Sequence, residues 1–344
     1  MIDFRYHVIS IVAVFLALAT GLVLGASLLN TQIIETQNSQ NESLIDDKNA
    51  LREELSALED QRDSLDQFIS AAGPLAVRDL LAEQRVVIVT LPTAEEGDGQ
   101  DLLDGVTADL LDAGVAEVVG TVAITDLWTD EGEVDVLDGL VAQLTRANIE
   151  LPEGRAYDRA AVLLASALVG PQPVREPPPD PSPTTTDPDE SESPDPDPTT
   201  EPPDGLSEND ISTILEGLSA GGFITFDGSP TAVADLAVIV APPAPETTDD
   251  RTEIVNGAWI RLATALDEIG MASVLTGPAA AAETGGVITA LRADDAASGV
   301  VSTVDSAESR PGQVATVVAL AAELNGQTGH YGQVGDVDGP IPVF

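Results

Sequence analysis

The amino-acid sequence predicts an α/β protein: an N-terminal transmembrane helix, a parallel coiled-coil stalk, and a doubly wound α/β domain that carries a disordered Pro/acidic insertion. Three observations lead to this prediction. An uncharged apolar run lies near the N-terminus, a leucine repeat with a period of seven follows it, and apolar strands alternate with amphipathic helices in the rest of the chain.

The apolar run, residues 8–29, is the predicted anchor. Its 22 uncharged residues would span about 33 Å as a helix, enough for a bilayer core of about 30 Å. Arg5 and His7 precede the run and Glu35 follows it, so the positive-inside bias predicts a single-pass protein of the cytoplasmic membrane, with a cytoplasmic N-terminus and an extracytoplasmic C-terminal domain. The alternative is a cleaved signal peptide, because Ala17-Leu18-Ala19 has the small-x-small pattern of a cleavage site.

Two patterns predict that the chain forms a homodimer. Gly21 and Gly25 lie one turn apart and would allow two anchors to approach closely. Behind them, leucines at every seventh position fit the d positions of a parallel coiled coil, and polar residues at a positions disfavour higher oligomers. The predicted dimerisation residues are Gly21, Gly25, Asn41, Leu44, Lys48, Leu51, Leu55, Leu58 and Leu65. The alternative is an amphipathic helix packed on its own domain. In both cases Gly73-Pro74 is expected to end the helix.

Beyond Pro74 the pattern alternates between strands and helices, which is typical of βαβ units. Strands are expected at 86–91, 117–124, 223–226, 236–241 and 273–276, and helices at 102–111, 134–147, 157–168, 211–218, 254–269 and from Pro311 onwards. Residues 171–204 contain 13 prolines and 10 acidic residues, a composition that favours disorder.

The sequence thus divides into six parts. We expect a cytoplasmic tail and anchor, a stalk, two halves of one α/β domain flanking the insertion, and a C-terminal tail. Their boundaries are 1–30, 31–72, 74–170, 171–204, 205–332 and 333–344. Two separate small domains are the alternative, but each would have a small core.

The composition limits the partners and the chemistry. The 344 residues include 14 basic and 59 acidic side chains, a formal net charge of −45 at pH 7, which works against binding nucleic acid or anionic lipid headgroups. There is no cysteine, so disulfides, thiolate metal sites and cysteine nucleophiles are excluded.

The search for catalytic, cofactor and metal sites predicts none. The two histidines, His7 and His330, lack the context of a catalytic base, and His330 is expected to be a surface or hydrogen-bonded residue. Gly97-Asp98-Gly99 begins like a dinucleotide loop, but the acidic residues around it would repel a pyrophosphate. Met1 and Met271 are too few for a copper(I) cage, and residues 336–339 match only the opening of an EF-hand.

The chain resembles the actinobacterial copper transporter MctB family over nearly everything except the insertion. The matching stretches are Val14 to Ala19 continuing to Gly25, Val86 to Ile88, Gly222 to Thr225, Ser302 to Asp305 leading to Pro311-Gly312, and the turn from Gly329 to Gly332. The resemblance implies an envelope protein, of the outer membrane for the best-known member, that is linked to copper export or homeostasis. A branch of the family is similar to SteB, a bitopic coiled-coil protein that controls peptidoglycan hydrolysis at division through a second envelope protein.

Three functions follow as hypotheses. The first is a dimeric, non-enzymatic scaffold that contacts membrane lipid through residues 8–29 and presents its α/β domain to an envelope protein partner, with copper implied by the family resemblance alone. The second is a SteB-like regulator of peptidoglycan hydrolysis and cell division. The third is an α/β enzyme of unknown substrate, disfavoured because triad and phosphate-loop signals are missing.

Overall fold

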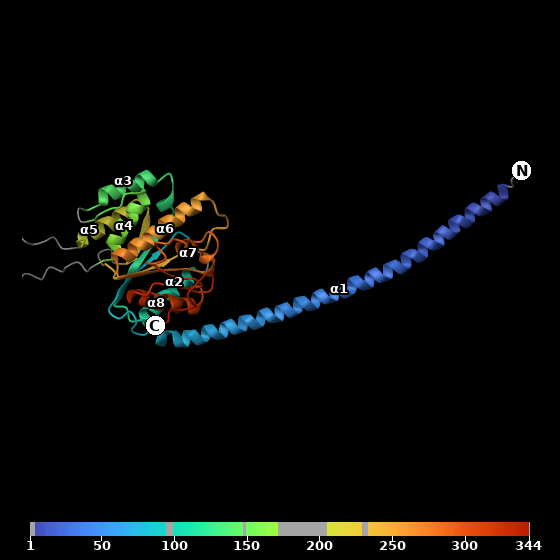
Figure 1. Cartoon of the computed structure of the whole chain (residues 1–344), viewed down its shortest axis with the longest axis horizontal. Helices are drawn as coiled ribbons and strands as arrows, with labels where there is room; N and C mark the ends of the chain where they lie inside the picture. The colour runs from blue at the N-terminus through green and yellow to red at the C-terminus, as the bar shows by residue number, and fades with distance from the viewer. Residues whose placement is uncertain (1–3, 94–98, 147–148, 171–204, 229–232, 344) are drawn as a thin grey trace, which may run out of the picture. The chain divides into compact units, whose positions relative to one another are not determined.

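The computed structural model describes residues 4–93, 99–146, 149–170, 205–228 and 233–343 (Figure 1). The chain separates into two compact units, Met1–Gln67 and Phe68–Phe344. The predicted insertion at 171–204 lies outside the described residues.

One helix, α1 (Phe4–Val77), contains both the predicted anchor and the predicted stalk. Its segment Tyr6–Gly25 has a mean hydropathy of 2.6 and is long and apolar enough to cross a membrane. The prediction that the helix ends at Gly73-Pro74 is wrong, because the helix continues through Pro74 to Val77. Proline costs a helix one backbone hydrogen bond. Here the following turn is held in place because Val77 is fully buried in the domain core.

Seven strands form one sheet in the order β3-β2-β1-β4-β5-β6-β7. All neighbours are parallel except β2 and β3, which are antiparallel. This mostly parallel sheet confirms the predicted α/β class. The strands are β1 (Arg85–Thr90), β2 (Glu117–Ile124), β3 (Ile224–Gly228), β4 (Leu236–Val240), β5 (Ala272–Thr276), β6 (Ser302–Val304) and β7 (His330–Tyr331).

Helices cover both faces of the sheet, with α3, α4, α5 and α6 on one face and α2 and α8 on the other (Figure 1). Side chains of a strand alternate between its two faces, so Val87 and Val89 join the first core whereas Val86 and Ile88 join the second. The helices are α2 (Gly99–Asp112), α3 (Val134–Leu144), α4 (Ala156–Leu168), α5 (Glu208–Ala220), α6 (Asp250–Ile269), α7 (Val287–Arg292) and α8 (Arg310–Leu324), with 3-10 turns η1 (Asp126–Thr129) and η2 (Ala279–Ala282).

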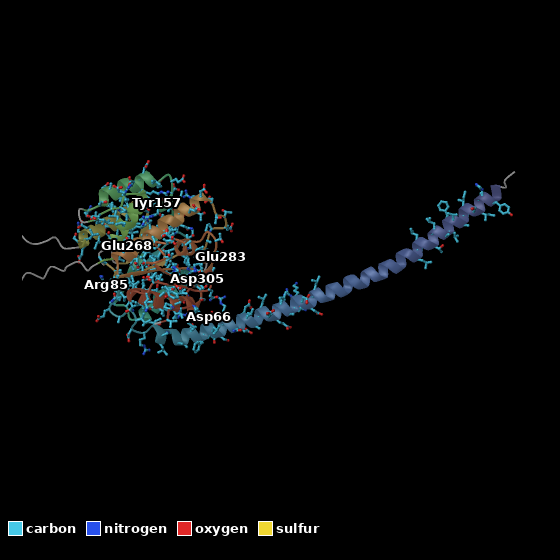
Figure 2. The ribbon with its side chains drawn as sticks, in the orientation of Figure 1. Asp66, Arg85, Tyr157, Glu268, Glu283 and Asp305 are labelled. Carbon is cyan, nitrogen blue, oxygen red and sulfur yellow. The ribbon has the colours of Figure 1, made fainter. Side chains whose placement is uncertain are left out.

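The two central strands, β1 and β4, come from opposite sides of the insertion. They pair in parallel from Val86↔Leu236 to Thr90↔Val240. Arg85, marked in Figure 2, fixes the start of this register. Its backbone N–H donates to Asp235 Oδ2 at 2.9 Å, and its guanidinium reaches Oδ1 at 3.2 Å. Residues on both sides of the insertion therefore build one sheet.

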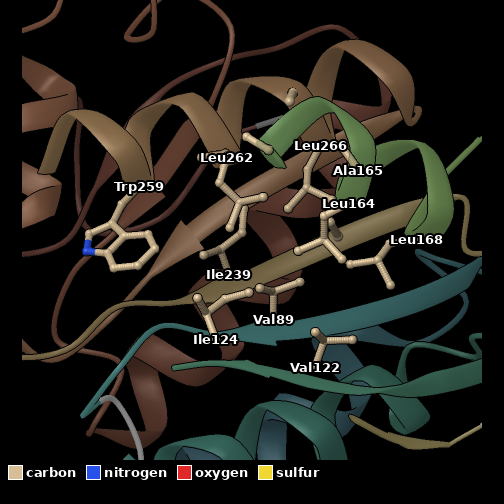
Figure 3. Packing of buried hydrophobic residues seen from close by; sticks show 14 of the residues in the cluster. Val89, Val122, Ile124, Leu164, Ala165, Leu168, Ile239, Trp259, Leu262 and Leu266 are labelled. Atoms are coloured by element: carbon tan, nitrogen blue, oxygen red, sulfur yellow. The ribbon is translucent and has the colours of Figure 1, made fainter. Parts of the chain in front are cut away.

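The larger core lies between the sheet and α4 and α6 (Figure 3). Leu164 of α4 and Leu262 of α6 are fully buried against Val89 and Ile239 of the central strands. Burying an aliphatic side chain of this size contributes about 1.5–3 kcal/mol. Because α4 precedes the insertion and α6 follows it, this core also depends on both halves of the chain.

On the opposite face, a buried ion pair joins α2 to α8. Arg310 donates to both carboxylate oxygens of Asp109, at 2.8 and 3.2 Å, and Asp109 is fully buried. Burial raises the pKa of Asp109, and the hydrogen bonds from Arg310 oppose that rise.

A half-buried carboxylate, Asp267 near the end of α6, faces the start of β5. The backbone N–H of Ser273 donates to Asp267 Oδ1 at 2.8 Å. Burial, reinforced by the negative charge of Glu323, raises the pKa of Asp267 from 3.8 to about 6. At neutral pH the native fold therefore holds an ionised carboxylate in an environment that favours its protonated form.

Replacing Asp267 with Asn is expected to raise the free energy of unfolding near neutral pH by about 1–2 kcal/mol after allowance for solvent screening. The amide cannot ionise but keeps an oxygen for Ser273. Since the native pKa is raised from 3.8 to about 6, the stabilising effect of protonation is complete below the lower value and is lost as pH rises through the upper one. The advantage of Asp267→Asn should therefore shrink as pH falls from about 6 and disappear below about pH 4.

Urea unfolding curves across this pH range measure the difference, with Glu268→Gln, an exposed neighbour on the same helix, as the control. A variant less stable than the natural chain at neutral pH would contradict this account of Asp267.

Candidate functional site

The predicted dimerisation residues all lie on α1. The five leucines at 44, 51, 55, 58 and 65 are each between 53% and 64% exposed. A Cβ added at Gly21 or Gly25 would meet no atom within 4 Å. The side chain of Asn41 lies outside the described residues, although its backbone belongs to the helix. The structure thus leaves this apolar stripe uncovered, and pairing through it stays a prediction.

The α/β domain has a crevice at the carboxyl ends of β1 and β4. The chain runs from β1 outward to β2 on one side and from β4 outward to β5 on the other, so the strand order reverses between these two strands. Open α/β sheets bind ligands at this kind of switch point. The cavity has a volume of about 460 Å³, within the usual range for small-ligand sites.

The inner wall of the crevice is apolar. Pro92 follows β1 and Pro242 and Pro243 follow β4, while Trp259 comes from α6. Trp259 is only 3% exposed, and its indole nitrogen points away from Ile239 and Leu262 of the core (Figure 3). Among the described residues the indole N–H has no hydrogen-bond partner, and the nitrogen is accessible to water. The crevice therefore presents an unused donor on an apolar surface.

The rim of the crevice is acidic. Asp126, Asp130 and Asp249 contribute carboxylates. The single cation of this lining, Arg251, lies 3.8 Å from a carboxylate oxygen of Glu131 and donates to the Thr129 carbonyl at 3.4 Å. Unlike charges attract, so the rim favours neutral or cationic ligands over anions.

The N-terminus of α6 does not offset this preference. Asp249 caps the helix by accepting from the Thr252 backbone N–H at 3.0 Å, and the Thr252 hydroxyl accepts from the Asp249 N–H in return. These bonds from Thr252 lower the pKa of Asp249. The N-terminus of α6 is therefore already capped by a carboxylate, which would repel an incoming phosphate.

A neighbouring cavity of about 950 Å³ is lined by Arg292 and His330. Arg292 is held by Asp305, a fully buried carboxylate after β6, with distances of 3.1 and 3.2 Å to its Oδ2 atom. The same guanidinium donates to the carbonyls of Tyr331 and Val334. Figure 2 marks Asp305 within the domain.

The remaining bonds of Asp305 come from its own loop and from the chain after β7. Ser306 Oγ and the Gln333 N–H each donate to Oδ1 at 2.7 Å, and the Val334 N–H donates to Oδ2 at 3.2 Å. Gly332 has a φ of +133°, and a Cβ there would lie 2.2 Å from the Asp305 carboxyl carbon. Only glycine fits at position 332, so the Asp305 cluster explains why a glycine stands there.

The other sequence candidates have structural roles or lie outside the described residues. His330 Nδ1 is hydrogen-bonded to Thr303 Oγ1 at 3.0 Å, in agreement with the expected hydrogen-bonded histidine. The EF-hand-like Asp338 accepts from the His330 N–H at 2.8 Å. Of Gly97-Asp98-Gly99, only Gly99 is described, as the first residue of α2. No group of three potential His, Asp or Glu ligands to a metal occurs among the described residues.

The crevice itself is absent from the sequence predictions. Trp259 could have been noticed as one of only two tryptophans in a chain with 3% aromatic residues. Asp305 and Gly332 were visible only as parts of the stretches Ser302 to Asp305 and Gly329 to Gly332. Neither their contact nor the reversal of strand order can be derived from local patterns.

Comparison with known proteins identifies relatives that align with almost the whole chain. A family model described as "Copper transport outer membrane protein, MctB" matches residues 1–342. Proteins named "Copper transporter MctB" from Mycobacterium bovis and Mycobacterium tuberculosis are 27% identical over 333 residues, which covers 96% of each chain. The protein of that name from Mycobacterium leprae is 27% identical over 340 residues, 97% of this chain and 96% of its own.

Replacing Gly332 with Ala is expected to lower the free energy of unfolding by about 3 kcal/mol or more, because the added methyl group meets a buried carboxylate and the backbone conformation is strained. Gly335 is the matched control, since its φ is +78° and an added Cβ meets no atom within 4 Å. Gly335→Ala should cost about 1 kcal/mol. Denaturant unfolding measures both changes, and equal losses would show that the Asp305 cluster is not tightly packed.

Proposed function

The chain belongs to the MctB family of copper transport outer membrane proteins, and from this premise we propose that it is a membrane-anchored, non-enzymatic envelope protein. It pairs through α1 and presents its α/β domain to an envelope partner, in support of copper transport or homeostasis. The observation that carries the proposal is the exposed stripe of leucines with a period of seven on α1.

The anchor in this proposal is the apolar segment Tyr6–Gly25. Its 20 residues cover about 30 Å as a helix, the thickness of a bilayer core. In the proposed topology, the short segment before it stays in the cytoplasm and the α/β domain lies outside the membrane. Membrane lipid covers the side chains that are exposed over this segment, including Phe15 and Leu22.

Pairing would bury the leucine stripe behind the anchor. Leu51, for example, is 60% exposed in the single chain, and a d position of a two-stranded coiled coil packs into the partner helix. Burial of apolar surface contributes about 25 cal/mol per Å², summed over five leucines on each helix. Lys48 at an a position favours two strands over three or four, at some cost in stability.

The copper role comes from the relatives, whose names identify them as copper transporters. The described side chains do not by themselves suggest how copper would be held, because no group of three potential ligands occurs among them. Met271 is exposed and stands on the domain surface. We therefore assign the copper role to the anchored assembly and its partner, and not to a catalytic or metal centre within the domain.

A regulator of peptidoglycan hydrolysis that acts through a second envelope protein is the alternative function. The observation that favours it is the open crevice at the carboxyl ends of β1 and β4, because a regulator needs a site that receives a partner and does not need a metal. Loss of the chain would then alter septation while copper accumulation stays normal.

The natural absence of cysteine permits a direct test of pairing. Leu51→Cys places a thiol at a d position, and Glu53→Cys places one two residues further on, at the outward f position. In membranes under mild oxidation, Leu51→Cys should form a disulfide-linked dimer at least about 10-fold faster than Glu53→Cys. Equal rates for the two variants would contradict a leucine-lined interface.

The copper role needs a separate test in cells. Deletion of the gene should change copper accumulation and tolerance, and a chain with Leu51→Asp and Leu58→Asp should behave like the deletion, because two buried charges oppose pairing. Glu53→Asp is the control, since it lies on the outward face. Normal copper accumulation after deletion would remove the copper role and leave the regulator.

A further inference from the structure

We propose that the crevice at the carboxyl ends of β1 and β4 binds an extended peptide segment of a partner protein in which an apolar side chain lies next to lysine or arginine. The inference rests on the proposed function only in taking the domain to meet a protein partner. It does not depend on pairing through α1, so the two proposals can fail separately.

The inner wall determines the apolar part of this ligand. The crevice is lined by Pro92, Pro242 and Pro243 at the strand ends and by Val255 and Trp259 of α6. Proline rings and valine side chains offer no hydrogen bonds, so a polar group placed against them would lose its water without compensation. An aliphatic side chain of the ligand removes apolar surface from water on both sides.

The indole N–H of Trp259 determines the acceptor. Trp259 is almost fully buried and lines the crevice, and its nitrogen has no hydrogen-bond partner among the described residues. Water reaches this nitrogen, so a ligand acceptor that replaces the water makes a net favourable hydrogen bond with it. An extended peptide carries a backbone carbonyl beside each side chain, so one residue supplies both the aliphatic group and the acceptor.

The rim determines the charge. Asp126 and Asp130, at η1, and Asp249, before α6, all line the crevice, while Arg251 is turned toward Glu131 and the Thr129 carbonyl. A lysine or arginine flanking the apolar residue would lie at this rim, where carboxylates attract it without the cost of full burial. The same carboxylates disfavour nucleotides and phosphorylated peptides.

The polar groups of the lining favour a peptide over a small polar metabolite. Binding sites for such metabolites usually place several fixed polar groups around the ligand. The polar groups of this lining are largely engaged with each other, since Asn256 Nδ2 donates to the Gly285 carbonyl at 2.9 Å and Thr252 is occupied in the cap of α6. Thr93, a non-glycine residue with a φ of +63°, also lines the crevice. Strain of this kind is often found at binding sites.

The test uses the full chain in lipid nanodiscs and the capped peptide acetyl-Arg-Leu-Arg-amide as the probe. With Trp128→Phe, Trp259 becomes the only tryptophan and its fluorescence reports on the crevice. Isothermal titration calorimetry on the chain that retains Trp128 gives a second measurement, which serves for the Trp259→Phe variant and for all variants if Trp128→Phe does not fold. We expect saturable binding with a Kd of about 1 mM or tighter, weakened by added salt.

Three variants identify the groups involved. Asp126→Lys should weaken the peptide at least about 5-fold, and Trp259→Phe, which removes the donor and keeps an aromatic ring, about 3–10-fold. Glu268→Lys is the matched control, because it makes the same charge change at an exposed position at the other end of α6. It should change the affinity less than about 2-fold.

Two further probes separate the possible ligands. Acetyl-Gln-Leu-Gln-amide should bind at least about 5-fold more weakly than the arginine peptide, and so should leucinamide, a free amine that lacks the extended chain. No binding of the arginine peptide at about 10 mM, equal binding of the glutamine peptide, or equal binding of leucinamide would each overturn the proposal. If the peptide binds while Leu51→Cys fails to form dimers, the crevice stands and the pairing proposal falls.

Discussion

The pairing of β1 with β4 is the contact on which the rest of the α/β domain depends. These strands are separated by more than a hundred residues of sequence, including the whole insertion, yet they are hydrogen-bonded neighbours in the middle of the sheet. Every residue of β4 is buried, which requires a layer of helices on each face. One layer is built around α4 and α6 and the other around α2 and α8, so each combines elements from both sides of the insertion.

The same pairing produces the crevice. Because the chain leaves β1 toward one side of the sheet and β4 toward the other, the strand order reverses between them, and open α/β sheets have a crevice at such a point. Prolines shortly after both strands line the crevice, and α6 contributes Trp259 to its wall. The ionic cluster of Asp305 and Arg292 stabilises the neighbouring loops after β6 and β7. The crevice is thus a consequence of topology, while its acidic rim reflects a composition that is strongly negative overall.

The side chains of α1 differ from those of the α/β domain in their exposure to solvent. Its side chains over Tyr6–Gly25 and along the leucine stripe are exposed in the single chain, so in the proposed assembly lipid and a second copy would bury them. The domain, in contrast, completes its own core.

Elements with a strong local sequence pattern were predicted, and elements that depend on distant contacts were not. The strands near residues 86–91 and 236–241 were predicted because buried parallel strands appear as continuous apolar runs. Strands β6 and β7 were missed, since three residues beginning with Ser302 and two beginning with His330 give no periodic pattern. The Gly73-Pro74 stop was wrong because the burial of Val77, a tertiary contact, outweighs the local effect of proline. The crevice was not predicted because it depends on strand order.

Hydrogen exchange measured by mass spectrometry on the full chain tests the central claim that both halves form one cooperative unit. The amides of β1 and β4 should be the most protected, and under exchange limited by global unfolding they should open with the same free energy. Protection in Leu236–Val240 with early exchange in Arg85–Thr90, or the reverse, would show that the halves unfold separately and would contradict the account.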